Sequence, residues 1–268
     1  MYEEYWKLTE KPFENTPDPK FFYSSSNHEE ALMRLYYVIK ERKGAGLLTG
    51  EYGSGKTMLT RLIVRELSCD ANRYKLALIV NPSLSAEDFL KEIIYQLEGR
   101  YFEGTKFYIL HAINDILYKS KEEDKDVIVI VDEAQAISNQ EMFEELRLLL
   151  NFQLNDRFLL TLILVGQPEL REKVNRLPQL KQRLAISFHL NVLSPEDTES
   201  YIEHRCKIAG ARQSLFSKEA CRIIAHNSGG VPRKINTYCE LSLMQAMIDK
   251  KKLVDEQIAE EAAEDINT

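Results

Sequence analysis

Apolar runs and segments of helical periodicity alternate along the first two thirds of this chain. The short apolar runs, several of them rich in β-branched residues, predict strands. These strands are expected at residues 45–49, 75–80, 126–131, 158–165 and 186–190. Helical spacing of apolar positions predicts helices between them, near residues 57–68, 86–98, 106–119, 139–154 and 168–175. Strands separated by helices form right-handed βαβ units, so the pattern predicts an α/β fold whose parallel sheet is flanked by helices.

The pattern changes after about Leu193, where the strand signals stop. Ser194 and Pro195 form a typical helix start, because serine caps free N–H groups and proline suits the first turn. Helices are expected near residues 195–209, 217–228, 232–249 and 255–264. The chain after residue 193 is therefore predicted to form a small all-helical second domain.

The N-terminal segment has a different composition. Residues 1–26 are rich in proline and aromatic side chains, including Trp6, Phe13 and Phe21. So many aromatic side chains are not expected to stay in water, so the segment is predicted to pack on the core of the protein. We therefore expect an N-terminal extension at residues 1–26, an α/β domain at 27–193 and a helical domain at 194–268.

Composition and charge exclude several classes of protein. The chain has 268 residues, 44% of them hydrophobic, which suffices for a sizeable core. No apolar run approaches the roughly 18 residues that span a bilayer, and the N-terminus lacks the pattern of a signal peptide. Four scattered cysteines predict reduced thiols rather than a disulfide framework or metal site. We expect a cytoplasmic protein, and its net charge of −7 argues against an extensive nucleic-acid-binding surface.

One motif predicts a ligand. Residues 50–57 read Gly-Glu-Tyr-Gly-Ser-Gly-Lys-Thr, which matches the phosphate-binding pattern G-x-x-x-x-G-K-[ST]. It lies between a predicted strand and a predicted helix, as such a loop requires. Lys56 is expected to contact the β- and γ-phosphates, and the Thr57 hydroxyl to bind Mg²⁺. The predicted nucleotide-binding residues of this loop are Gly50, Glu51, Tyr52, Gly53, Ser54, Gly55, Lys56, Thr57 and Met58.

A second element supports a nucleotide site. Residues 127–131 are consecutive β-branched residues, typical of a strand buried on both faces, and Asp132 and Glu133 follow directly. Ligands of open α/β sheets bind beyond the carboxyl ends of the strands. We therefore expect Asp132 to hold Mg²⁺ and Glu133 to act as general base toward water. His28 is interpreted as a solvated helix-cap residue, with contact to the nucleotide base as the alternative.

Together these residues resemble the AAA+ ATPases of the general secretion pathway protein A type. The motifs that carry the resemblance extend along nearly the whole chain. They are Lys11-Pro12-Phe13, residues 17–23 (PDPKFFY), residues 28–32 (HEEAL), the phosphate loop, Asp132-Glu133-Ala134-Gln135, residues 165–170 (VGQPEL), Gln182-Arg183-Leu184 and residues 230–236 (GVPRKIN). The phosphate loop is common to many NTPases, but its combination with VGQPEL and GVPRKIN is far more specific.

The resemblance implies three further site residues. Gln167 corresponds to the first sensor, which contacts the γ-phosphate or the attacking water. Arg183 resembles the arginine finger that reaches the ATP of a neighbouring subunit, with Arg176 as the alternative. Arg233 matches the second sensor, which binds the γ-phosphate from the helical domain of the same chain.

The resemblance also implies ATP and Mg²⁺ as cofactors and an ATPase that remodels a partner. The expected assembly is a homo-oligomer formed through the nucleotide sites, a ring or spiral with six subunits as the expected number. The partner protein would belong to a secretion, pilus or polysaccharide-export system. Many relatives continue into a membrane helix and a peptidoglycan-binding domain, which this chain does not contain, so membrane coupling would need a separate partner.

Two other functions stay open. The first is an ATP-dependent DNA-binding regulator of the transposition-protein (Mu B-like) kind. Arg100 and Lys106 around Gly104, or the run 250–252 (KKK), would supply its phosphate contacts. The second is a scaffold that binds ATP and hydrolyses it poorly, although Glu133 and Arg183 argue against it.

Overall fold

A computed structural model describes residues 2–267 and contains a five-stranded parallel sheet with strand order β2-β3-β4-β1-β5. The strands are β1 (Ala45–Gly50), β2 (Tyr74–Ile79), β3 (Asp126–Val131), β4 (Leu160–Gly166) and β5 (Leu184–Leu190). All their pairings are parallel, so the predicted sheet is confirmed. β4 begins two residues later than predicted, because Phe158 pairs antiparallel with Gln153 in an isolated bridge before the chain joins the sheet.

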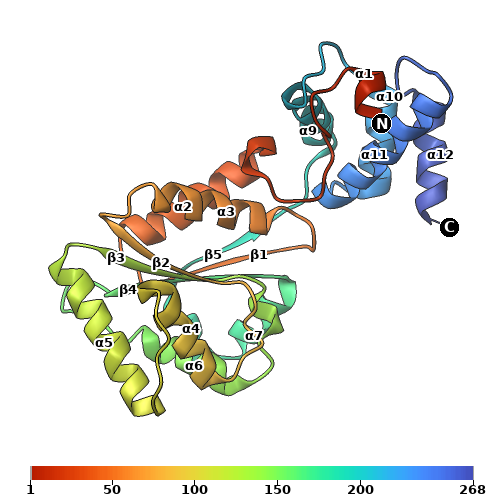
Figure 1. The fold of residues 1–268 in the computed structure, drawn as a ribbon. Coiled ribbons are helices and arrows are strands. Elements are labelled where there is room, and N and C mark those ends of the chain that lie inside the picture. Colours follow the sequence, from red (N-terminus) through yellow and green to blue (C-terminus); the bar gives the residue numbers. More distant parts are fainter. Residues whose placement is uncertain (1, 268) are drawn as a thin grey trace. The chain divides into compact units, whose positions relative to one another are not determined.

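Helices cover both faces of the sheet (Figure 1). One face carries α2 (Ser26–Lys40) and α3 (Lys56–Ser68). The opposite face carries α4 (Ala86–Glu98), α5 (Lys106–Glu122), α6 (Gln140–Leu149) and α7 (Pro168–Asn175). Burial on both sides explains why β1, β3 and β4 are buried at every position and read as continuous apolar runs.

Two compact units make up the chain. Residues 28–50 and 59–190 form the unit that contains the sheet, while residues 2–27, the loop 51–58 and residues 191–267 form a helical unit. The helices of the latter are α1 (Tyr2–Trp6), η1 (Pro19–Phe21), α9 (Pro195–Ile208), α10 (Lys218–Ser228), α11 (Pro232–Ile248) and α12 (Glu256–Asn267). The predicted helical C-terminal part is thus present, and the division at residues 26 and 193 stays a prediction.

The core of the helical unit explains the aromatic N-terminal segment. Tyr2, Trp6, Phe13 and Phe21 are buried together with apolar residues of α9 to α12. Arg205 of α9 holds the segment in place, donating hydrogen bonds to the carbonyl oxygens of Pro12 and Glu14. We expected this segment to pack on the core of the protein, and the core that it joins is that of the helical unit.

Local signals set several helix ends. Ser194 and Ser217 accept hydrogen bonds from the N–H groups of Asp197 and Ala220, so both act as N-caps. α6 ends at Leu149 instead of the expected residue 154, because the next residues close tight i→i−3 hydrogen bonds. The short helices η2 (Ala134–Ala136) and α8 (Pro178–Lys181) were not predicted, since one turn leaves no apolar periodicity in the sequence.

Candidate functional site

The phosphate loop connects the end of β1 to the start of α3. Gly53 and Gly55 have φ angles of 80° and 104°, a region that glycine adopts without steric cost. The Lys56 side chain is 5% exposed, and its ammonium donates a hydrogen bond of 2.8 Å to the carbonyl oxygen of Glu51. The lysine amine therefore lies against the backbone of the loop, and the predicted strand–loop–helix context is present.

The two carboxylates follow β3. Asp132 is 3% exposed and continues the strand pairing, because its N–H donates to the carbonyl oxygen of Ile79 over 2.9 Å. Its Oδ1 accepts a 2.9 Å hydrogen bond from the N–H of Glu133. β3, β4 and β1 are parallel neighbours in the sheet, so Asp132 and Glu133, residue Gln167 after β4, and the start of the phosphate loop after β1 all follow strands at the same edge.

Glu133 has a left-handed backbone, with φ 52° and ψ 33°, directly before η2. This conformation is uncommon for residues other than glycine and asparagine and often marks a functional position. Its carboxylate accepts a hydrogen bond from the side-chain N–H of Gln135. The side-chain oxygen of Gln135 in turn accepts a 3.0 Å hydrogen bond from the N–H of Gln167. Gln135 therefore links the predicted base after β3 to the predicted sensor after β4.

Gln135 follows the acid pair within the motif Asp132-Glu133-Ala134-Gln135, and no pattern in the sequence predicts a role for it. Two neighbours make its position specific. A Cβ atom on Gly166 would lie 2.6 Å from the side-chain oxygen of Gln135, so only glycine leaves that space open. The Lys173 ammonium of α7 donates to the carbonyl oxygens of Gln135 and Ile137, at 2.6 and 2.7 Å, and so holds the middle of η2 and the residue that follows it.

Gln167 lies where the sequence predicted, directly after β4 and before Pro168 at the first turn of α7. It occupies the N-cap position, but its side chain makes no capping hydrogen bond. The side chain is therefore not required to start the helix. Its proposed role as a sensor is compatible with this geometry.

The two candidate finger residues lie close in the chain on the unit that contains the sheet. Arg183 is half-buried between α8 and β5, and one of its terminal nitrogens donates a 3.1 Å hydrogen bond to the side-chain oxygen of Asn151. Arg176 is exposed at the C-terminal end of α7. Both arginines stay candidates, and Arg183 has the more defined orientation.

Arg233 lies in the first turn of α11 and contacts the phosphate loop within the helical unit. Its N–H donates to the carbonyl oxygen of Gly53 over 3.3 Å. Its guanidinium lies 4.8 Å from the centre of the Tyr52 ring and donates to the Tyr52 hydroxyl. A Cβ on Gly53 would approach the Cβ of Arg233 to 2.7 Å, so glycine at this position permits the close contact.

Several other candidates are placed differently from expectation. His28 is 5% exposed, so its interpretation as a solvated cap residue is wrong: the first turn of α2 is buried on this side. Lys106 forms an ion pair with the buried carboxylate of Glu145, and Lys251 pairs with Asp255 at 3.1 Å. Both lysines therefore have acidic partners already, which reduces their suitability for DNA phosphates.

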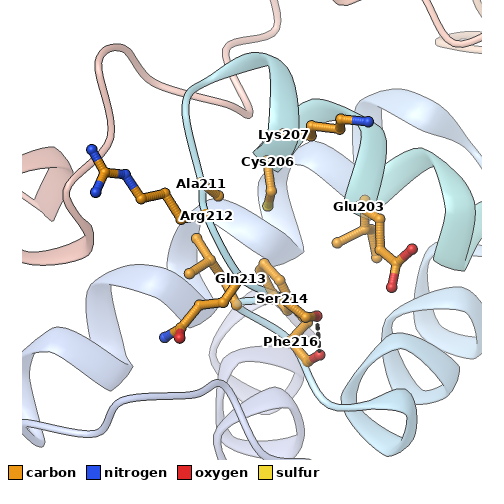
Figure 2. Close-up of a pocket in the computed structure, with 10 residues that line it drawn as sticks. Glu203, Cys206, Lys207, Ala211, Arg212, Gln213, Ser214 and Phe216 are labelled. Atoms are coloured by element: carbon orange, nitrogen blue, oxygen red, sulfur yellow. Dashed lines mark hydrogen bonds between the residues drawn. The ribbon is translucent and has the colours of Figure 1, made fainter.

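A hollow of about 320 Å³ lies in the helical unit (Figure 2). Arg212 and Lys207 point away from each other at its rim, and the Cys206 thiol faces its interior. Burial raises the pKa of the Cys206 thiol well above its ordinary value, so the thiol stays protonated and offers no nucleophile. The lining shares no residue with the predicted nucleotide site.

Comparison with known proteins identifies the family. The AAA domain family matches residues 39–174. General secretion pathway protein A from Aeromonas hydrophila is 36% identical over 249 residues, which cover 92% of this chain and 45% of that protein. DNA polymerase III subunit gamma from Buchnera aphidicola is 25% identical over 190 residues, 70% of this chain and 48% of that protein. The chain thus spans less than half the length of these curated relatives.

Solved structures show the same fold. The Aeropyrum pernix ORC2 protein superposes with a TM-score of 0.70 at 16% identity, covering 95% of this chain and 71% of that one. The Thermotoga maritima RuvB branch migration motor superposes with a TM-score of 0.58 at 18% identity, covering 90% and 69%. Within residues 2–267, no helix combines the length and apolar character needed to cross a bilayer. The match over residues 39–174, the phosphate loop after β1 and the acid pair after β3 place this chain in the AAA domain family, among AAA+ P-loop proteins related to general secretion pathway protein A.

Proposed function

We propose that this chain is a Mg²⁺-dependent ATPase that assembles through its nucleotide sites and uses ATP turnover to remodel a partner protein. The observation that supports it most is the arrangement around Glu133. Glu133 has a left-handed backbone and directly follows Asp132, and its carboxylate is linked through Gln135 to Gln167, the residue after β4. A strand end without chemical function would not need this fixed carboxylate.

The side chains at the predicted site suit Mg²⁺, which binds together with phosphates and water, better than a metal whose ligands are all protein side chains. Thr57 and Asp132 offer a hydroxyl and a carboxylate oxygen, which are the hard ligands that Mg²⁺ prefers. Among residues 2–267, no group of three or more histidine, cysteine or acidic side chains is placed to hold a metal. This fits Mg²⁺, because that ion is usually bound by one or two side chains together with phosphates and water.

Each residue then has one task. The N–H groups of residues 50–58 and the Lys56 ammonium bind the phosphates, while Thr57 and Asp132 hold Mg²⁺, which neutralises charge on the phosphoryl oxygens. Glu133 accepts the proton of the attacking water, and Gln167 orients that water or the γ-phosphate. Arg183, or Arg176 in its place, stabilises the transferring phosphoryl group of a neighbouring subunit, an effect typically worth about 10³–10⁵ in rate.

Two substitutions test the site. Lys56→Ala is expected to abolish ATP binding, and Glu133→Gln to retain binding while turnover falls by about 100-fold or more. Lys218→Ala and Glu141→Gln, which alter exposed residues of α10 and α6, are the matched controls. Normal ATP turnover in both site variants would refute the proposed enzyme, and binding without any turnover in the unaltered protein would favour the scaffold.

Assembly is tested by the dependence of rate on concentration. If an arginine completes the site of a neighbour, the specific activity should rise with protein concentration. Mixing Arg183→Ala with Lys56→Ala subunits should partly restore turnover, because each variant supplies what the other lacks. If turnover is restored when Arg176→Ala, and not Arg183→Ala, is mixed with Lys56→Ala, the finger is Arg176. A specific activity that stays constant as the protein concentration rises would argue against a shared site.

The relation to general secretion pathway protein A supports a partner in a secretion, pilus or polysaccharide-export system. We also propose a cytoplasmic location for this chain, with a partner holding it at the inner membrane as the alternative. A Glu133→Gln variant would hold the ATP-bound form. Purified with candidate export proteins, it should bind the true partner in the presence of ATP and release it with ADP. Equal binding with either nucleotide would refute remodelling driven by ATP.

A second function, ATP-dependent DNA binding, is supported by exposed rings in the first turn of α5 and just before it. Tyr101, Phe107 and Tyr108 are 85%, 63% and 61% exposed, and Arg100 precedes them. Exposed rings next to a cation suit base stacking on single strands, and an Aeropyrum pernix ORC1 structure of the same fold is a complex with DNA. Filter binding at two salt concentrations, with and without an ATP analogue, tests it. Absence of ATP-dependent binding at low salt would exclude it.

A further inference from the structure

We propose that Tyr52 is a positioning residue, which orients Arg233 toward the phosphates and thereby sets the preference of the site for ATP over ADP. The inference rests on the proposed function and on the role that the family resemblance implies for Arg233, which is to bind the γ-phosphate. Tyr52 occupies one of the variable positions of the phosphate loop, so the motif itself does not require an aromatic residue there.

Packing alone does not explain an aromatic residue at this position. The Tyr52 side chain is 60% exposed, so little apolar area is buried there. Its ring has a specific neighbour instead, the Arg233 guanidinium, whose central carbon lies 4.8 Å from the ring centre. One terminal nitrogen of the same guanidinium donates to the Tyr52 hydroxyl. Tyr52 therefore contacts the guanidinium both through its ring and through its hydroxyl.

The other end of Arg233 is fixed by the same loop. Its backbone N–H donates to the carbonyl oxygen of Gly53 over 3.3 Å, and Gly53 leaves space for the Cβ of Arg233. Arg233 therefore contacts the phosphate loop both through its backbone N–H and through its guanidinium. A guanidinium carries five N–H donors, so one bond to Tyr52 leaves four for a phosphate.

Preorganisation is the expected benefit. A free arginine side chain loses rotamer freedom when it binds a ligand, and this loss weakens binding. Because Tyr52 and Gly53 already hold Arg233 beside the loop that cradles the phosphates, less freedom remains to be lost when the γ-phosphate arrives. ADP has no γ-phosphate, so its affinity should not depend on this contact.

The test measures Kd for ADP and for ATPγS in the full chain with Mg²⁺, by displacement of a fluorescent ADP analogue. Tyr52→Leu should weaken ATPγS binding by about two- to fivefold, as expected for an exposed cation–π contact. The affinity for ADP should stay unchanged. Tyr52→Phe keeps the ring and should retain most of the preference. In an Arg233→Ala background, Tyr52→Leu should have no further effect.

Tyr37→Leu is the matched control, because Tyr37 is 50% exposed and its ring contacts the Lys43 ammonium at 5.8 Å. The inference would be overturned if Tyr52→Leu weakened ADP and ATPγS binding equally. It would also be overturned if Tyr52→Leu still weakened ATPγS binding by the same factor in the Arg233→Ala background. The proposed function fails separately, when Lys56→Ala binds nucleotide as the unaltered chain does. If Lys56→Ala loses nucleotide binding as expected but Tyr52→Leu keeps the preference for ATPγS over ADP, the role of Tyr52 is rejected and the proposed function stands.

Discussion

The side-chain oxygen of Gln135 accepts a 3.0 Å hydrogen bond from the backbone N–H of Gln167. The same amide donates its N–H to the carboxylate of Glu133. The two bonds fix the orientation of the amide, because only its oxygen can accept from an N–H and only its nitrogen can donate to a carboxylate. Gln135 therefore transmits the position of the end of β4 to the proposed general base.

Replacing Gln135 by alanine should slow catalysis without weakening nucleotide binding. The Glu133 carboxylate would lose the donor that orients it, and misplacement of a catalytic group by about 1 Å can cost roughly 100-fold in rate. Single-turnover hydrolysis at saturating ATP should fall about 10- to 100-fold, while Kd for ATPγS stays unchanged. The control is Gln140→Ala, at an exposed position that begins α6. A parallel loss of ATPγS affinity would show that Gln135 supports the fold of the site instead.

Gly166→Ala tests the same link from β4. The added Cβ would lie 2.6 Å from the side-chain oxygen of Gln135 and 2.8 Å from a methyl carbon of Leu170. Both contacts are too short, so either the amide moves or the strand shifts. Overpacking of this kind typically costs about 1–3 kcal/mol. Urea unfolding should show this loss, and turnover should fall as in Gln135→Ala. Unchanged stability and turnover would mean that the site tolerates a methyl group.

The sequence was sufficient where a local signal carried the structure. Val127 to Val131 are β-branched and lie in a strand buried at every position, and the spacing of Gly50 to Thr57 predicted a loop between β1 and α3. Ser194 and Pro195 marked the start of α9. In each case neighbouring residues determine the conformation, so a short window contains the information.

Relationships between distant residues were not predictable in this way. The Gln135–Gln167 hydrogen bond depends on β3 and β4 being neighbours, which no short pattern specifies. Tyr52 and Arg233 are 181 positions apart. The aromatic residues of the N-terminal segment predicted that the segment is buried, but they did not predict which surface buries it. The hydrophobic effect is not directional, so any apolar surface would serve.

Arg205 should be essential for the stability of the helical unit. It is 3% exposed, donates to the carbonyl oxygens of Pro12 and Glu14 and to the hydroxyl of Tyr201, and lies 4.9 Å from the centre of the Phe21 ring. Arg205→Ala leaves these buried acceptors without a donor, at a cost of about 3 kcal/mol. Thermal unfolding should show the loss.

Arg205→Lys should restore little of that stability, because an ammonium cannot reproduce the planar fork of donors. The matched control is Arg222→Lys, which alters an exposed arginine of α10. Full recovery by lysine would mean that the positive charge matters and the fork does not.

His204 should make the helical unit less stable in acid. Burial lowers the pKa of His204, and the nearby charges of Arg205 and Lys207 lower it further, although a backbone hydrogen bond at Phe22 opposes them. The unfolded chain therefore takes up this proton at a higher pH than the folded chain, near the usual value of about 6.5. Stability should be full above that pH and fall as the pH drops through the lowered folded value. Unfolding in urea at about pH 7.5 and pH 5.5 should show a smaller loss for His204→Gln than for the unaltered protein, and equal losses would contradict this origin.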